Sequence, residues 1–408
     1  MQKQNRLGIN WGCLGLFIAL FFWWPSESFA GGSTLEQRIL ALEKRNSADE
    51  DLRRAFSWLK KFKPLGDFRL RHDSLFRKGS NPSASQRFDR SRQRIRFRIG
   101  GEFFFTPNLK VGFRLASGDS SPTSTNQTLD NSFSSKNINL DKAYVDWLIP
   151  RGNSSLRLKG GKFGVPFMKT QQVWDSDVTV EGFAERLAHK FGNTQLELIL
   201  GQFVVEEFSP SATDGATDDI HLLAYQGIVS QKLGDRSKAR VAVTLYDYND
   251  LRGNITTSGA TGNTLDGNGR FQTNYDILNI LAEIGTDAVM GIPVKFFGGY
   301  VQNISKDADN LENKGWEAGV KIGKKVKKFG DWQIKYFFRN TERDAVLSAL
   351  DDSDFHEGST NSKGSNAGLN IGLYKGIQLA LTYFNSESIT GPKTDLELFQ
   401  VDLILTLF

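Results

Sequence analysis

Basic and apolar residues alternate strictly within residues 92–100, where Arg94, Arg96 and Arg98 are interleaved with Ile, Phe and Ile. Successive side chains of a strand point to opposite faces, so this pattern predicts a strand with guanidinium groups on one face and bulky apolar groups on the other. A soluble sandwich would bury the apolar face and leave the arginines in water. A membrane barrel would turn the apolar face to lipid and the arginines to an aqueous lumen. The choice depends on whether the pattern repeats.

The same alternation recurs from Asp67 to Phe408. Residues two apart match in polarity over about sixteen segments, which is the period of strands and not of helices. The predicted strands lie near residues 67–76, 92–105, 109–117, 139–149, 155–163, 178–190, 195–206, 220–232, 238–248, 273–284, 293–303, 315–323, 331–340, 365–374, 376–385 and 395–408.

The connections between these segments alternate between short turns and long polar loops. The short ones lie near residues 106–108, 150–153, 191–194, 234–237, 285–292, 324–330 and 374–376. The long ones lie near residues 77–89, 118–137, 164–177, 207–219, 249–272, 304–314, 341–364 and 386–394. A transmembrane barrel has short turns at one end and long loops at the other, whereas a sandwich has no reason for this regularity. The sequence therefore predicts an all-β transmembrane antiparallel β-barrel of about 16 strands over residues 64–408.

The last strand gives a further test of the lipid face. Its apolar residues of one parity are predicted to contact lipid: Phe399, Val401, Leu403, Leu405 and Leu407. Aromatic residues near the strand ends fit the interfacial girdles of a membrane barrel, although each one by itself could be an ordinary core residue. The chain ends on Phe408.

The N-terminal part of the chain lacks the two-residue period. A basic start, a short apolar run and a Ser-Phe-Ala cleavage pattern predict a signal peptide over residues 1–30. A transmembrane anchor is less favoured, because the run is shorter than the ~20 residues of a span. Residues 31–63 carry Leu35, Ile39 and Leu42 at heptad-like spacing, which predicts a short α-helical coiled-coil segment, with a solvated linker helix as the alternative.

Composition narrows the remaining possibilities. The chain has 408 residues, a formal net charge of +5 and a single cysteine, Cys13, inside the predicted signal peptide. The mature protein would therefore contain no disulfide. Its basic residues are spread over alternating strands and not gathered in one block, so nucleic-acid binding is not expected.

Basic residues of lumen parity on consecutive strands predict a positive wall inside the barrel. Its members are Arg69, Arg71, Arg94, Arg96, Arg98, Arg114, Lys142, Arg157 and Lys159. Guanidinium groups suit such a wall because they stay charged and are weakly hydrated. The alternative is a lumen that is simply polar, with no selectivity.

The third long loop is predicted to carry the opposite charge. After the Gly-Lys-Phe-Gly-Val-Pro-Phe stretch at residues 161–167 come Asp175, Asp177 and Glu181. In general porins this loop folds inward and sets carboxylates against an arginine wall. Facing charges of opposite sign create a transverse field, which orients dipolar solutes and disfavours apolar ones. These three acids are therefore the expected constriction residues.

The predicted signal peptide, the coiled-coil segment, the basic early strands, the 161–167 stretch and the terminal Phe408 together resemble the "putative porin" family of Gram-negative bacteria. That family is similar in layout to phosphate-selective porins. The resemblance implies a passive diffusion channel for small hydrophilic solutes, exported to the outer membrane and in contact with its lipid. It also implies a homotrimer held in part by the coiled coil. Phe408 resembles the signal that the barrel-assembly machinery recognises.

An enzyme is not expected. The four histidines show no triad or metal-ligand spacing, so we predict no catalytic residue, metal or cofactor. The predicted function is a pore with weak anion preference. The alternative is a structural or adhesive barrel whose lumen is plugged and whose long loops bind an external partner.

Overall fold

A computed structural model describes residues 34–37, 39, 40, 44, 57–79, 89–208, 219–287, 290–308 and 312–408. The chain divides into two compact units, Met1–Trp58 and Leu59–Phe408. In the first unit, residues 35–37, 39, 40 and 44 are helical. The predicted signal peptide and most of the predicted coiled coil lie outside the described residues, so both stay predictions. Among the residues described, no helix is long and apolar enough to cross a membrane.

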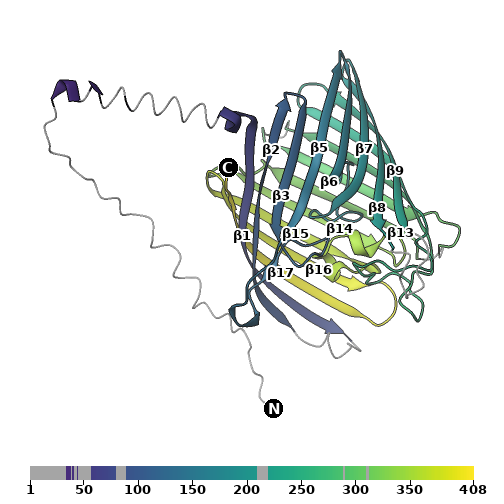
Figure 1. Ribbon diagram of the computed structural model, residues 1–408. Helices are drawn as coiled ribbons and strands as arrows, with labels where there is room; N and C mark the ends of the chain where they lie inside the picture. The colour runs from purple at the N-terminus through teal and green to yellow at the C-terminus, as the bar shows by residue number, and fades with distance from the viewer. Residues whose placement is uncertain are drawn as a thin grey trace. The chain divides into compact units, whose positions relative to one another are not determined.

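The described part of the second unit is one antiparallel sheet of sixteen long strands that closes into a barrel (Figure 1). The strands are β1 Phe62–Gly79, β2 Arg90–Thr106, β3 Leu109–Ser117, β5 Ile138–Arg151, β6 Ser154–Gly164, β7 Thr179–Phe191, β8 Thr194–Glu206, β9 Ile220–Leu233, β10 Ser237–Tyr248, β11 Tyr275–Thr286, β12 Val294–Asn303, β13 Lys314–Gly323, β14 Trp332–Thr341, β15 Ser362–Tyr374, β16 Ile377–Ser388 and β17 Thr394–Thr406. Each pairs with its neighbours in sequence, and β1 pairs with β17 from Asp67↔Thr406 to Gly79↔Thr394. The predicted sixteen-stranded barrel is thus confirmed.

Short elements complete the described chain. The two-residue β4, Gln127–Thr128, lies in a long loop and pairs with β2. Four 3-10 helices are present: η2 Ser57–Lys61, η4 Asn131–Phe133, η5 Ser348–Leu350 and η6 Phe355–Gly358. The predicted boundary at residue 64 is slightly late, because β1 already begins at Phe62 and includes Pro64. Proline is tolerated there because it lies near the start of the strand.

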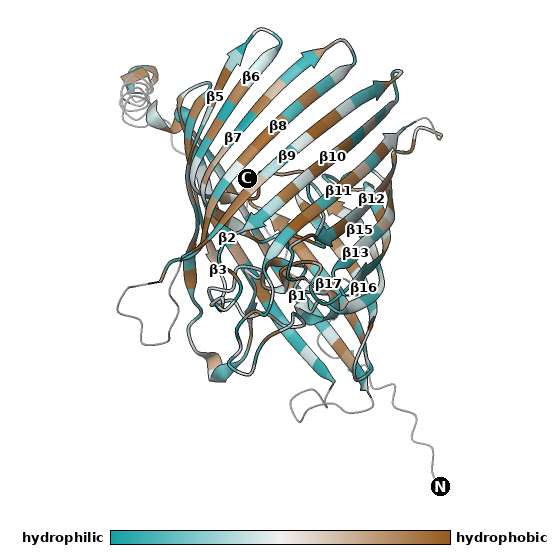
Figure 2. Cartoon of the chain, turned by 90° about the vertical axis from the view of Figure 1, so that its right-hand side faces the viewer, coloured by the Kyte–Doolittle hydropathy of each residue, from teal (hydrophilic) through white to brown (hydrophobic). Residues whose placement is uncertain are grey.

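The two faces of the strands differ as the alternation predicts. The outer face exposes large apolar residues such as Phe113 and Trp147, while Asp146, the neighbour of Trp147, is 4% exposed and faces inward. On β17, Phe399 is exposed and Gln400 is buried, which places the predicted lipid face outward. In Figure 2, brown and teal segments alternate along the strands of the barrel wall. Residues that share the parity of Asp146 and Gln400 therefore face the lumen in these strands.

The largest hydrophobic core lies inside the barrel. It joins lumen-facing residues of β6 to β12 with apolar residues of three long connections, at 165–178, 249–274 and 342–361. A smaller cluster joins Phe337, Phe355 and Phe384 with leucines of β1 and β17. Loops that enter a barrel need such apolar partners, since burying their backbone in a purely polar lumen provides little hydrophobic stabilisation. The core therefore determines where the loops sit across the lumen.

Candidate functional site

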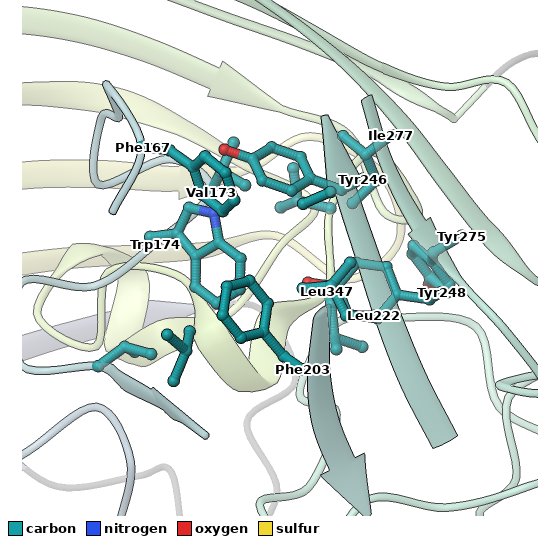
Figure 3. Packing of buried hydrophobic residues seen from close by; sticks show 14 of the residues in the cluster. Phe167, Val173, Trp174, Phe203, Leu222, Tyr246, Tyr248, Tyr275, Ile277 and Leu347 are labelled. Atoms are coloured by element: carbon teal, nitrogen blue, oxygen red, sulfur yellow. The ribbon is translucent and has the colours of Figure 1, made fainter. Parts of the chain in front are cut away.

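The connection between β6 and β7, residues 165–178, folds into the barrel. Trp174 anchors it: its side chain is 1% exposed and its ring lies 5.7 Å from that of Tyr246, edge to face. Phe167 makes a second edge-to-face contact with Tyr246 at 5.5 Å. Figure 3 shows Phe167 and Trp174 packed against side chains of the barrel wall. The predicted inward fold of the third long loop is present.

A second long connection, residues 342–361 between β14 and β15, meets the first inside the barrel. The backbone N–H of Asp175 donates to the carbonyl of Leu350 at 2.7 Å. The Asp175 carboxylate accepts from the backbone N–H and the hydroxyl of Ser353, at 2.9 and 3.0 Å. The two connections, named here the 165–178 loop and the 342–361 loop, therefore form one docked unit.

The predicted basic wall lies inside the barrel on adjacent strands. Arg69 of β1 is paired in register with Arg96 of β2, and Arg71 with Arg94. Arg69, Arg71 and Arg96 are buried, each at most 9% exposed. Like charges directly opposite one another repel, so such a ladder requires compensating acids.

Carboxylates are interleaved with these arginines. Asp67 binds Arg96 and Arg98, each at 2.8 Å. Asp402 of β17 binds Arg71 through two hydrogen bonds of 2.7 and 2.8 Å, the bidentate geometry that makes such pairs strong. Further pairs join Asp73 with Arg92 and Arg94. The sequence analysis identified the arginines and missed the acids that neutralise them, although Asp67 and Asp73 have the same parity.

The rest of the predicted wall shows the same pairing. Arg114 binds Asp141. Asp146 lies 3.4 Å from Arg157 and 3.6 Å from Lys159. Lys142 of β5 shares the lumen parity of Asp146 and is half-buried. All nine predicted wall residues thus have lumen-facing positions, but most are held in ion pairs.

Two of the three predicted constriction acids lie at the meeting point of loop and wall. Asp177 binds Arg98 at 3.2 Å and accepts from the Thr125 hydroxyl at 2.9 Å. Asp175 holds the 342–361 loop, as described above. The assignment of Glu181 to the constriction is wrong. Glu181 lies in β7, its side chain is 62% exposed, and it pairs with Lys162. Its neighbour Val180 is the inward-facing residue, so the strand alternation turns Glu181 outward.

The 342–361 loop supplies acids that the sequence analysis did not identify. Asp354 binds Arg71 at 3.0 Å, and Asp352 binds Arg339 at 3.3 Å. The run Asp351 to Asp354 contains three aspartates, and this cluster of acids could have identified the loop as a source of negative charge. What sequence alone does not show is that this loop, like the 165–178 loop, turns inward.

The docked loops perturb the ionisation of their carboxyl groups. Burial, together with the nearby Asp352 charge, raises the pKa of Asp175 to about 7. Burial also opposes ionisation of Asp177 and Asp354, but neighbouring guanidinium groups outweigh it. Arg96 and Arg98 hold the pKa of Asp177 below its usual value, and Arg71 does the same for Asp354.

Two cavities follow the inner surface of the docked loops. The first, named here the arginine cavity, has a volume of about 200 Å³ and is lined by Arg69, Arg71 and Arg96 together with loop acids. The second, named the lysine cavity, has a volume of about 170 Å³ and lies against β11 to β14. Gln171, Lys335 and Phe337 line both. The two cavities therefore adjoin.

The two cavities differ in charge. The arginine cavity is lined by four bases and four acids: Arg69, Arg71, Arg96, Lys335, Asp175, Asp177, Asp352 and Asp354. The lysine cavity is lined by five bases and two acids: Lys169, Lys295, Lys321, Lys335, Arg339, Glu283 and Glu317. With every group ionised, the first is balanced and the second has a surplus of three positive charges. The basic residues of β12 to β14 were not predicted as a site.

A third cavity of about 640 Å³ lies towards the long-loop end of the barrel. Serine and threonine hydroxyls, among them Ser117, Ser124 and Thr179, line it together with the apolar Trp174 and Leu347. Its charged lining residues are one base, Lys162, and four acids, Asp141, Glu181, Glu206 and Glu207, so it lacks the positive surplus of the lysine cavity.

Comparison with known proteins gives a family and a fold. A family model described as "Putative porin" matches residues 76–272 and 270–407. No curated protein matches the sequence significantly. The high-pH structure of OprB from Pseudomonas putida aligns with 86% of this chain and 96% of its own, at 11% identity and a TM-score of 0.55. A triple mutant of the Rhodopseudomonas blastica porin aligns with 85% of this chain and 100% of its own, at 9% identity and a TM-score of 0.42. At such identity the likeness to OprB shows the fold alone.

Proposed function

This chain belongs to the porin family whose model covers residues 76–407, and from that membership we propose that its barrel is a water-filled diffusion channel for small hydrophilic solutes with a weak preference for anions. The family and the barrel make it an outer-membrane protein. The observation that carries the proposal is the lumen itself, where charged side chains of the wall face inward and line two adjoining cavities.

The preference for anions is weak because the wall is paired. Asp67, Asp73 and Asp402 compensate much of the charge of the arginines beside them. An ion that enters therefore meets alternating signs and not a uniform positive field. The surplus of three positive charges that lines the lysine cavity favours anions.

The opposed charges also support selection by polarity. Asp177 and Asp354 of the docked loops lie against Arg98 and Arg71 of the wall. Such a field acts across the passage, where it orients dipolar solutes and makes the entry of apolar ones unfavourable. The expected substrates are therefore small, hydrated and polar.

A structural or adhesive barrel with a plugged lumen is the second candidate. It is favoured by the apolar core inside β6 to β12, since the 165–178 loop and the 342–361 loop fill that part of the lumen. Liposome swelling distinguishes the two candidates. A plugged barrel gives no swelling with any sugar or salt, whereas a channel gives swelling that declines with solute size.

We further propose that the protein is a homotrimer. On the outer face of β1 and β2, where lipid would be the neighbour, His72 lies 2.6 Å from Gln93 and 3.1 Å from Ser74. Polar side chains on the outer face of a barrel are unfavourable against lipid, so a neighbouring barrel is the better contact for them. Residues 31–63, as a coiled coil, would assist association.

Export and assembly complete the proposal. Residues 1–30 would act as a cleaved signal peptide, and Phe408, which is exposed after the end of β17, would be recognised by the barrel-assembly machinery. Heat-modifiable migration on gels, for the chain with and without residues 33–61, tests barrel and trimer together. A trimer band that needs those residues supports the coiled coil.

Single-channel recording in a planar bilayer with a salt gradient is the main test of function. We expect steady conductance and a reversal potential on the anion side. A reconstituted, folded barrel that does not conduct contradicts the channel. A firm preference for cations contradicts only the anion preference.

A further inference from the structure

We propose that the lysine cavity is a binding subsite for a small dianion with oxygen acceptors, held chiefly by Lys321 and Lys335. The proposal rests on the channel function above and assigns its anion preference to the wall of β13 and β14. The arginine wall, which the sequence makes more conspicuous, would then contribute less to anion binding.

The two lysines are neighbours across a strand pair. Lys321 of β13 is directly opposite Lys335 of β14 in the register. Both share the inward parity of the buried Glu317 and Arg339, which lie on the same two strands. Side chains directly opposite in an antiparallel pair have Cβ atoms about 4.5–5.5 Å apart, so two ammonium groups here can contact one ligand.

Neither lysine has a carboxylate of its own. Within the described residues, neither Lys321 nor Lys335 forms an ion pair. The two acids that line the cavity are engaged elsewhere: Glu317 binds Arg339 at 3.0 Å, and Glu283 binds Lys295 and Arg240. Like charges in register are destabilising, and a bound dianion relieves that repulsion.

Phenyl rings support the two ammonium groups. Lys321 Nζ lies 5.5 Å from the ring centroid of Phe297, and Lys335 Nζ lies 4.5 Å from that of Phe337. A ring face attracts a cation without neutralising its charge. The rings also exclude water from one side of each ammonium group, which strengthens its attraction for an anion. The arrangement therefore holds the charges in place and keeps them available.

The 165–178 loop closes the cavity with two more donors. Lys169 Nζ donates to the backbone carbonyl of Asp175 at 2.8 Å, which fixes the lysine beside the cavity. Burial lowers the pKa of Lys169 to about 8, so at neutral pH most of it is charged. The hydroxyl of Thr170, which also belongs to a residue lining the cavity, has no hydrogen-bond partner among the described residues.

The chemistry of the cavity indicates the class of ligand. Two adjacent ammonium groups and a surplus of three positive charges favour a divalent anion over a monovalent one, because each ligand charge finds its own partner. Ammonium and hydroxyl donors favour oxygen acceptors over halides. Sulfate, hydrogen phosphate and short dicarboxylates share these properties.

Sulfate is the probe for the first experiment. Channels in planar bilayers are recorded in potassium chloride while potassium sulfate is added at constant ionic strength. We expect saturable inhibition of the chloride current, because a bound dianion occupies the passage for longer than chloride does. In Lys321→Gln/Lys335→Gln the half-inhibiting concentration should rise about tenfold or more, equivalent to 1.4 kcal/mol or more.

Two further variants keep the result interpretable. Lys321→Arg/Lys335→Arg retains both charges and should retain the inhibition. Lys324→Gln/Lys325→Gln removes the same charge from exposed positions in the adjacent turn and should behave as the parent. Heat-modifiable migration of each variant shows that the barrel has folded.

The result that overturns the proposal is sulfate inhibition that is absent from the parent channel or unchanged in Lys321→Gln/Lys335→Gln. The double variant Arg96→Gln/Asp67→Asn removes the positive charge of Arg96 from the arginine cavity together with the negative charge of its partner Asp67. If sulfate inhibition is lost in this variant instead, the binding site lies in the arginine cavity and the proposal is also overturned. Calorimetric titration of sulfate into the detergent-solubilised protein measures binding without conduction. It therefore distinguishes failure of the binding site from failure of the proposed channel function. A barrel that does not conduct but binds sulfate through the two lysines contradicts the function and keeps the site. Succinate in place of sulfate distinguishes dicarboxylate from inorganic ligands.

Discussion

The Asp175 carboxylate accepts two hydrogen bonds from Ser353, one from the backbone N–H at 2.9 Å and one from the hydroxyl at 3.0 Å. This contact joins the 165–178 loop to the 342–361 loop, which lie far apart in the sequence. The shape of the passage therefore depends on how the two loops dock on each other. A change at either residue is expected to move both loops.

Docking of the loops should depend on pH. The pKa of Asp175 is raised from 3.8 to about 7, first by burial and then by the Asp352 charge. A raised pKa means that the docked state binds the proton more tightly than the undocked state. Its stabilisation is complete below about pH 4 and is lost as the pH rises through about 7. Burial also raises the pKa values of Asp351 and Asp352.

Channel recordings between pH 5 and pH 8 check this prediction. We expect steady currents at pH 5 and larger, more frequent fluctuations at pH 8. Asp175→Asn, which cannot ionise, should flatten the dependence. Asp177 and Asp354 have lowered pKa values and so lose their contribution only in more acidic solution. Fluctuations that increase towards pH 5 would contradict the assignment to Asp175.

Trp174 is predicted to hold the 165–178 loop inside the barrel. Its side chain is almost fully buried against Tyr246, so Trp174→Ala removes a large apolar contact worth about 3–5 kcal/mol. The strand ladder does not involve this residue, and the barrel should still migrate as a folded form. We expect higher conductance with frequent sublevels, measured in single channels. Trp174→Phe should have a smaller effect, and an unchanged conductance in Trp174→Ala would show that the loop is held by other contacts.

The barrel could be predicted from the sequence because its signal is local. A strand has a period of two residues, and one parity meets lipid while the other meets water, so each strand carries its own evidence. Arg94 and Ile95 are examples, since their neighbours in the sequence suffice to assign their faces. The alternation of short turns and long loops then indicated that the strands close into a barrel and gave the approximate number of strands.

The site was less predictable because it depends on contacts between distant segments. Nothing near Ser353 in the sequence indicates that it binds Asp175, and Lys321 becomes part of a site only through its register with Lys335. Apolar partners inside the barrel draw the loops inward, and these partners are spread over β6 to β12. Glu181 was assigned wrongly for a local reason, since the alternation of Val180 and Ala184 already turned it outward.

The seam between the first and last strands should depend on Arg71 and Asp402. Their paired hydrogen bonds are buried, and removing one partner of such a pair costs about 3–5 kcal/mol. Asp402→Asn should therefore lower the temperature at which the folded band on a gel converts to the unfolded one. The exposed pair Lys78 and Glu397 crosses the same seam, and Glu397→Gln should change little, within about 1 kcal/mol. Equal effects of the two variants would contradict a role for burial.

The arginines of β2 provide a test of charge pairing. Replacing Arg94, Arg96 and Arg98 with Gln should leave the barrel folded, because the strand ladder and the apolar outer face are unchanged. It also leaves Asp67 and Asp177 without their arginine partners, and it leaves Asp73 with Arg92 alone. The lumen then gains unpaired negative charge, and the reversal potential in a salt gradient should shift towards cations.

A compensated variant makes that prediction specific. Adding Asp67→Asn and Asp73→Asn to the triple arginine variant removes acids together with their bases, so most of the shift should reverse. Reversal follows because an ion responds to the summed charge of the wall and not to the arginines alone. If the compensated variant stays as cation-preferring as the triple variant, the guanidinium groups act as individual anion contacts and the pairing with Asp67 and Asp73 has no influence on permeation.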